Sequence, residues 1–251
     1  MVHFVGAGCG AADLITVRGK NLLEKADVII YAGSLVNPEL LNYAKQECEI
    51  HNSAKMTLDD VISVIEKAES ENKTTVRLHT GDPSIYGAIR EQMDRLDELS
   101  IAYDVCPGVS SFCGAAAALK AEYTLPDVSQ TVILTRMEGR TPVPDRENIR
   151  SLASHGATMI VFLSASMTGK LSEELIKGGY SPDTPAAIVY KATWADQKVM
   201  RCTISSLAET AEKNGINKTA LIVVGNFLGT DYELSKLYSA DFETGFRKAS
   251  R

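Results

Sequence analysis

Short runs of apolar, mostly β-branched residues alternate along the chain with longer stretches in which apolar residues recur every three or four positions. The short runs predict strands and the longer stretches predict amphipathic helices, so the pattern indicates an α/β protein. Thr57 or Asp59 is expected to cap the helix at 57–68. Strands are expected at 2–5, 27–31, 75–79, 131–135, 159–163, 186–190 and 220–225, and helices within 13–26, near 37–47, at 57–68 and at 112–121.

An alanine-rich helix and the loop L-P-D-V-S-Q at 125–130 separate two sets of these elements. We expect an N-terminal α/β domain over residues 1–115, a linker over 116–130 and a C-terminal α/β domain over 131–251. Two α/β domains joined in this way usually hold their ligand in the cleft between them.

Composition narrows the range of functions. With 45% hydrophobic and 23% charged residues, the 251-residue chain has the balance of a soluble globular protein. A net charge of −6 disfavours nucleic acid as a partner. The five cysteines form no C-x-x-C motif, so neither a metal site nor a disulfide framework is expected. No signal peptide or long apolar run is evident, which predicts a cytoplasmic protein without a membrane anchor.

The first strand leads into V-G-A-G-C-G-A, where Gly6, Gly8 and Ala11 match the G-x-G-x-x-G/A pattern of dinucleotide-binding turns. That pattern also needs an acidic residue at the end of the second strand to bind the ribose hydroxyls. The acid nearest that strand, Asp27, stands at its beginning. A nucleotide-binding module or an NAD(P)-dependent oxidoreductase is therefore kept as an alternative.

Three more glycine turns follow apolar strands, at residues 32–35, 80–83 and 107–111. Ligands of α/β sheets bind at the carboxyl ends of the strands, so all four glycine loops can line one crevice. In the second of these turns, Asp82 can accept hydrogen bonds from backbone amides or ligand hydroxyls, and Pro83 suits the first position of a helix. The alternative is that Asp82 only caps that helix.

The segments V-G-A-G-C-G-A-A-D-L-I-T-V-R-G, G-D-P-S-I-Y-G and P-G-V-S-S-F, in this order, resemble the S-adenosylmethionine-dependent tetrapyrrole methyltransferases. The resemblance continues through T-M-I-V-F-L and A-L-I-V-V-G in the second half. The segment Y-A-G-S-L-V-N-P-E-L-L at 31–41 resembles the branch that methylates C11 of precorrin-4 or cobalt-precorrin-4 in cobalamin synthesis.

This resemblance implies a homodimer and a methyl donor held between the domains, with S-adenosylhomocysteine as the product. It also implies that the first glycine loop borders the trough for the tetrapyrrole. The family usually has G-x-G-P-G there, and Cys9 replaces the proline. The implied donor contacts are Gly81, Asp82, Pro83, Ile85, Ser110, Ser111, Leu163, Tyr190, Lys191, Ala192, Thr219, Ala220 and Leu221. The implied tetrapyrrole contacts are Gly6, Gly8, Gly10, Gly33, Ser34 and Tyr86.

The implied substrate is an anionic tetrapyrrole with several carboxylates, so this acidic protein must concentrate basic side chains around it. Arginine suits such a site because its guanidinium binds a carboxylate with two hydrogen bonds. Each basic residue could equally be an ordinary surface charge. The candidates are Arg18, Lys20, Arg90, Arg136, Arg140 and Arg146.

Methyl transfer from a sulfonium needs alignment rather than a general base, and the four histidines form no motif. We therefore assign no catalytic residue. Another member of the same family, acting at C1, C3/C17 or C20 of a tetrapyrrole or on a protein or ribosomal RNA, remains the nearest alternative.

Overall fold

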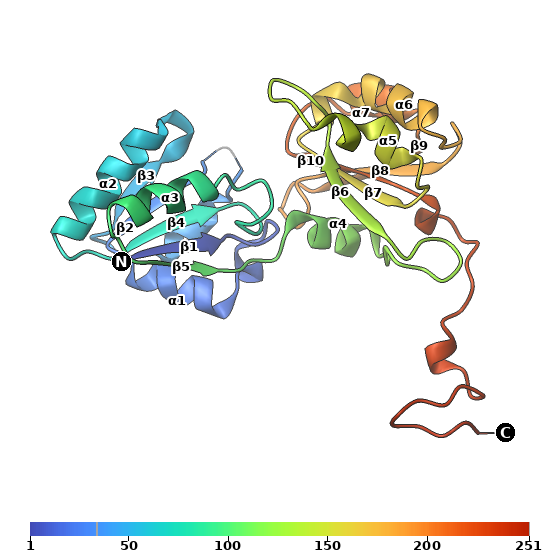
Figure 1. The fold of residues 1–251 in the computed structure, drawn as a ribbon, viewed down its shortest axis with the longest axis horizontal. Helices are drawn as coiled ribbons and strands as arrows, with labels where there is room; N and C mark the ends of the chain where they lie inside the picture. Colours follow the sequence, from blue (N-terminus) through green and yellow to red (C-terminus); the bar gives the residue numbers. More distant parts are fainter. Residues whose placement is uncertain (34, 251) are drawn as a thin grey trace. The chain divides into compact units, whose positions relative to one another are not determined.

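The computed structural model describes residues 1–33 and 35–250, and the chain divides into two compact units (Figure 1). The first unit contains Met1–Ala115 and Lys191–Gln197, and the second contains Ala116–Tyr190 and the chain from Lys198 onward. Each unit has its own five-stranded sheet with helices packed against it. The prediction of two α/β units is therefore confirmed.

The sheet of the first unit has the strand order β3-β2-β4-β1-β5, and its four strand pairings are all parallel. The loops that follow β1, β2, β4 and β5 therefore all leave the sheet at one edge. This edge is where ligands of parallel sheets bind. The strands are β1 (Val2–Gly6), β2 (Val28–Tyr31), β3 (Glu49–Asn52), β4 (Thr75–His79) and β5 (Tyr103–Cys106).

Helices cover both faces of this sheet. They are α1 (Val17–Lys25), α2 (Leu58–Ser70) and α3 (Arg90–Glu98). Helix α4 (Ser111–Leu119) follows β5, and its residues from Ala116 onward belong to the second unit. Leu23 of α1 packs with Val5 on one face, and Ile62 of α2 packs with Phe4 on the other. Successive strand residues point to opposite faces, so two buried faces require the nearly continuous apolar runs seen in β1 and β2.

The second unit has the strand order β6-β7-β10-β8-β9. Only β6 and β7 pair in parallel among these strands; the other three pairings are antiparallel. The strands are β6 (Val132–Arg136), β7 (Thr158–Phe162), β8 (Pro185–Tyr190), β9 (Lys198–Thr203) and β10 (Ala220–Val224). The helices are α5 (Ile149–Ala153), α6 (Thr168–Lys177) and α7 (Leu207–Lys213).

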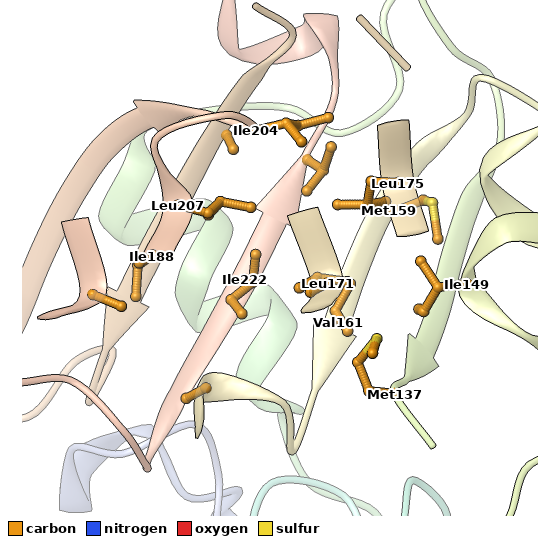
Figure 2. Close-up of a cluster of buried hydrophobic side chains, with 14 of the residues drawn as sticks. Met137, Ile149, Met159, Val161, Leu171, Leu175, Ile188, Ile204, Leu207 and Ile222 are labelled. Carbon is orange, nitrogen blue, oxygen red and sulfur yellow. The ribbon is translucent and has the colours of Figure 1, made fainter. Parts of the chain in front are cut away.

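One apolar core holds these helices against the sheet of the second unit. Figure 2 shows Leu171 and Leu175 of α6 and Leu207 of α7 among side chains of the strands, including Ile188 and Ile222. All five are fully buried. Burial of each side chain contributes on the order of 1.5–3 kcal/mol to the free energy of folding, relative to an exposed position. The strands and the buried helix faces of this unit are therefore apolar in sequence.

Three details of secondary structure differ from the expectations or decide between them. The segment expected as a helix near 37–47 is a 3-10 helix over Pro38–Tyr43. Strands β3 and β9 were not expected; both are edge strands with exposed polar residues, so neither has the apolar pattern of a central strand. Thr57 is the cap of α2, in a reciprocal capping box with Asp60.

Within the part of the chain that the structure describes, no helix combines the length and the apolar character needed to cross a bilayer.

Candidate functional site

Three glycines from different loops touch where β1, β4 and β5 end. A Cβ atom on Gly6 would lie 2.6 Å from the Gly108 Cα and from the Gly81 carbonyl oxygen. A Cβ on Gly108 would lie 2.2 Å from the same oxygen. Gly8 and Gly81 also exchange two backbone hydrogen bonds of 3.2 and 3.0 Å. Only glycine, which has no Cβ, allows two backbones to approach this closely. Three of the four predicted loops are therefore in direct contact through their glycines.

The carboxylate of Asp82 joins two of these loops. Its Oδ1 accepts hydrogen bonds from the Ser84 hydroxyl and from the Ser84 amide at 2.9 Å, and its Oδ2 accepts from the Gly108 amide at 2.9 Å. Partial burial opposes ionisation of Asp82, but these three hydrogen bonds outweigh it and lower the pKa of the carboxyl. The charged side chain therefore fixes the Gly81 turn relative to the loop after β5.

The segment after Asp82 is a turn rather than the helix that the sequence predicts at Pro83. Residues 83–86 form the turn, and α3 begins only at Arg90. Tyr86 and Ala88 have φ angles of 55° and 49°, left-handed values that a right-handed helix does not contain. The helix predicted at Pro83 is therefore wrong, and Asp82 caps a turn instead.

We expect Asp82→Ala to lower the free energy of unfolding by about 1–2 kcal/mol, because two backbone amides lose a charged acceptor. If the Gly81 turn binds the donor, affinity for S-adenosylhomocysteine should fall about tenfold as the turn loosens. Urea denaturation and calorimetry measure the two effects, with exposed Asp183→Ala as the matched control. A loss of stability with unchanged donor affinity would make Asp82 structural and remove it from the donor site.

The first glycine loop is held from two sides. Its Gly10 carbonyl accepts a hydrogen bond from Asn37 Nδ2 at 3.1 Å, and its Ala11 amide donates to Thr193 Oγ1 at 2.9 Å. Asn37 is buried. Neither residue belongs to a motif that predicts these contacts, although the position of Asn37 just before Pro38 is a signal for its capping of the 3-10 helix.

The geometry of this loop does not fit a dinucleotide turn. In such a turn the pyrophosphate meets the N-terminus of the helix that follows the glycines directly. Here α1 begins only at Val17, well after Gly10, and Thr16 caps it by accepting from the Gly19 amide at 3.1 Å. The loop amides at Gly8 and Ala11 already donate to other parts of the first unit.

Four of the donor residues predicted in the first unit, Gly81, Ser110, Ser111 and Ala192, lie in a network of contacts that includes this loop. A Cβ on Gly81 would lie 3.3 Å from the Ser111 amide nitrogen and 3.4 Å from the Ser110 Cα. A Cβ on Gly114 would lie 2.8 Å from the Cys9 Cβ and 3.5 Å from the Ala192 Cβ. The loops at 81–83, 110–111 and 191–192 therefore meet around α4 and the first glycine loop.

The donor residues predicted in the second unit gather at one edge of its sheet. Leu163 follows β7, Tyr190 ends β8 and Ala220 begins β10, and the register pairs Ala220 with Tyr190 and Ile222 with Val161. The flanking positions Leu163 and Thr219 have φ angles of 52° and 54°. Left-handed non-glycine residues are costly and cluster at functional sites, which supports a ligand at this edge.

Two ionisable side chains that no motif identified are buried on one face of β4. Arg77 donates to Gln92 Oε1 at 2.9 Å and to the Ile30 carbonyl at 3.1 Å, and burial lowers its pKa to about 10. Burial and the nearby Arg77 charge lower the pKa of His79 to about 3. Among the described residues, none hydrogen-bonds to His79 Nε2. An uncharged imidazole therefore stands directly before the Gly81 turn.

Comparison with known proteins identifies the family to which this chain belongs. Residues 1–208 match the family model described as Tetrapyrrole (Corrin/Porphyrin) Methylases. The chain belongs to this family. The tetrapyrrole methylase fold that the resemblance implied is thereby confirmed.

The chain is similar over its length to individual members of this methylase family. It is 55% identical to a cobalt-precorrin-4 C(11)-methyltransferase of Methanocaldococcus jannaschii, with 100% of this chain and 97% of the relative covered. It is 43% identical to a precorrin-4 C(11)-methyltransferase of Sinorhizobium sp, with 98% of each covered. A crystal structure of a cobalt precorrin-4 methyltransferase matches with a TM-score of 0.89 and 46% identity, over 91% of this chain and 96% of that one.

The basic residues of the first unit of this methylase differ in their surroundings. Arg18 is exposed in the first turn of α1, whereas Lys20 in the same helix pairs with Glu24 at 2.6 Å. Arg90 opens α3 and pairs with Asp94 at 2.7 Å. Helices that follow parallel strands begin near the carboxyl edge of the sheet. Because Arg18 and Arg90 lie in the first turns of their helices, we expect them near the edge that carries the glycine loops.

In the second unit of the methylase, Arg136 already has a structural task. Its guanidinium donates to three backbone carbonyls of the loop after β6, at 2.6–3.2 Å. Arg140 is exposed in that loop, and Arg146 pairs with Glu147 at 3.7 Å. Arg140 is therefore the better candidate of the three for a substrate carboxylate.

Two of the remaining tetrapyrrole positions, Gly33 and Tyr86, follow β2 and the Gly81 turn respectively. Gly33 follows β2 and packs on Asn52, because a Cβ there would lie 2.1 Å from Asn52 Oδ1. Ser34 lies outside the described residues. Tyr86 is about half exposed after the Gly81 turn. Across residues 1–33 and 35–250, no three His, Cys, Asp or Glu side chains are grouped to bind a metal ion.

Proposed function

We propose that this methylase transfers a methyl group from S-adenosylmethionine to C11 of precorrin-4 or cobalt-precorrin-4, in cobalamin synthesis. The observation that carries the proposal is 55% identity over the whole chain to an enzyme named for that reaction. Asn37 adds local support: it belongs to the segment 31–41 that resembles this branch, and it binds the first glycine loop at Gly10.

The donor supplies a methyl group on a sulfonium; as the new carbon–carbon bond forms, the carbon–sulfur bond breaks and the sulfur leaves as a neutral thioether. The chain must hold both reactants in line and exclude water, which can supply most of the acceleration. The contacts among Gly6, Gly81 and Gly108 suit this task, because glycine loops packed backbone to backbone give a ligand a rigid surface.

The residues present fit an adenosyl donor. Leu163 is 59% exposed with a left-handed backbone, although it directly follows a buried strand. An apolar side chain held outward in this way suits an aromatic ring such as adenine. We propose the donor contacts that the resemblance implies, with backbone groups of the Gly81 turn and of the segment after β8 as the polar part.

For the tetrapyrrole we propose the first glycine loop, Gly33 and Tyr86 as the contact surface. Arg18, Arg90 and Arg140 are the proposed carboxylate partners, because their side chains are exposed. We propose that Arg136 contributes less to carboxylate binding, because its guanidinium already donates to backbone carbonyls of the loop after β6. A homodimer and a cytoplasmic location stay predictions from the resemblance and the composition.

The test is methylation in vitro with S-adenosylmethionine carrying a carbon-13 methyl group. We expect precorrin-4, cobalt-precorrin-4 or both to gain one methyl group by mass, with the carbon-13 signal assigned to C11 by NMR. Labelling at C1, C3/C17 or C20 would move the chain to another branch of the family. No labelling of either substrate would overturn the proposal.

A thermal-shift comparison addresses the alternative from a different class. A ligand that binds only the folded state raises the melting temperature with its concentration. We expect S-adenosylhomocysteine to stabilise the protein and NADPH to leave it unchanged, since the first loop does not have the geometry of a dinucleotide turn.

A further inference from the structure

The connection between β8 and β9 lies on the first glycine loop. Although both strands belong to the second unit, residues Lys191–Gln197 belong to the first. Thr193 Oγ1 accepts from the Ala11 amide at 2.9 Å and donates to Cys9 Sγ at 3.9 Å. At Gly10 a Cβ would lie 2.3 Å from the Ala192 carbonyl oxygen and 2.5 Å from Trp194 Cδ1. The two backbones therefore touch, and one hydroxyl group joins them.

This connection has a strained backbone. Lys191 and Thr193 have φ angles of 46° and 66°. A left-handed conformation is unusual for any residue other than glycine and is most costly for a β-branched one such as threonine. Contacts must hold it in place: Lys191 Nζ pairs with Asp196 at 2.6 Å and lies 5.0 Å from the centre of the Trp194 ring.

We infer that this connection couples the two substrates: a donor bound at Lys191 and Ala192 raises the affinity of the first glycine loop for the tetrapyrrole, through the Thr193 hydroxyl. The inference rests on the proposed function. Lys191 and Ala192 are proposed donor contacts, and the next two residues contact the loop proposed for the tetrapyrrole. A donor that orders the connection also orders the loop, so the second ligand loses less conformational entropy on binding. Thr193 is then a positioning residue.

The coupling is measured with S-adenosylhomocysteine, which binds without reacting, and with cobalt-precorrin-4 handled without oxygen. In the wild-type protein, saturating S-adenosylhomocysteine should tighten cobalt-precorrin-4 binding at least fivefold, the lower end of typical coupling between sites. Trp194 is the sole tryptophan of the chain, so its fluorescence should also change when S-adenosylhomocysteine binds alone.

Two variants isolate the hydroxyl. Thr193→Val keeps the β-branched shape and removes the hydrogen bond to Ala11, whereas Thr193→Ser keeps the hydroxyl. We expect the coupling factor to fall below twofold in the valine variant and to stay near the wild-type value in the serine variant. The affinity of the valine variant for S-adenosylhomocysteine alone should change less than threefold.

Three results would overturn the inference: a wild-type factor below twofold, full coupling in the valine variant, or a valine variant that chiefly loses donor affinity. Measurement of methyl transfer by the wild-type protein distinguishes failure of this inference from failure of the proposed function. A wild-type protein that methylates cobalt-precorrin-4 without coupling contradicts only the inference. A wild-type protein that neither binds S-adenosylhomocysteine nor methylates either substrate contradicts the proposed function, and the inference with it.

Discussion

Gly108→Ala is expected to lower the free energy of unfolding by more than about 3 kcal/mol, at the upper end of the range for overpacking. The new methyl group would lie 2.2 Å from the Gly81 carbonyl oxygen and 2.7 Å from the Gly6 Cα. Both neighbours are backbone atoms at the ends of buried strands, so neither can rotate away as a side chain would. The Gly81 turn must move instead, and the affinity for S-adenosylhomocysteine should fall at least tenfold.

Gly169→Ala is the matched control, because the nearest atom to a Cβ at that helical position is 3.9 Å away. Alanine favours a helix over glycine, so this variant should gain up to about 1 kcal/mol and bind the donor normally. Urea denaturation and calorimetry apply to both variants. A Gly108→Ala protein with wild-type stability and donor affinity would show that the three loops do not meet as described.

Strands β1, β2 and β4 of the first unit were predictable because each is buried on both faces. The predicted strands at 2–5, 27–31 and 75–79 correspond to β1, β2 and β4, and the glycines that follow them stand at one edge because the sheet is parallel. The glycine loops were therefore visible in the sequence. Their mutual contact was not, because it depends on strand order and on distances across the sheet.

The parts that sequence reasoning missed depend on contacts between distant segments. Thr193 accepts a hydrogen bond from a loop amide that lies 182 positions away, and Asn37 donates one to a loop carbonyl that lies 27 positions away. Neither partner can be deduced from local pattern. The turn after Asp82 was mistaken for a helix because Pro83 is typical of both, and the left-handed Tyr86 and Ala88 that end the turn are not glycines.

The sequence likewise does not predict that Arg77 and His79 are buried. Successive side chains of a strand point to opposite faces, so Arg77 and His79 in T-V-R-L-H lie on the same face. Two polar residues on one face are typical of a strand face in contact with solvent. In the structure α2 and α3 cover that face, and both side chains are buried. Gln92 of α3 provides the acceptor that makes burial of Arg77 possible.

The buried histidine should make the protein sensitive to mild acid. Burial, together with the charge of Arg77, lowers the pKa of folded His79 to about 3, whereas an unfolded histidine has a pKa of about 6.5. Between these values the unfolded chain binds a proton that the folded chain does not. Unfolding is therefore favoured as the pH falls, by about 1.4 kcal/mol per pH unit below about pH 6.5. At pH 5 this amounts to about 2 kcal/mol of lost stability.

His79→Gln removes the titrating group and keeps a neutral polar side chain of similar size, so it should flatten this part of the pH profile whatever it does to stability at pH 7. We expect the free energy of unfolding of the wild-type protein to fall between pH 7 and pH 5 by about 2 kcal/mol more than that of the variant. Urea denaturation at several pH values measures the difference, and His155→Gln, at an exposed position, controls for the loss of an imidazole. Parallel profiles for the wild-type protein and His79→Gln would mean that His79 accepts its proton without unfolding, and that the imidazole before the Gly81 turn is not held neutral by the fold.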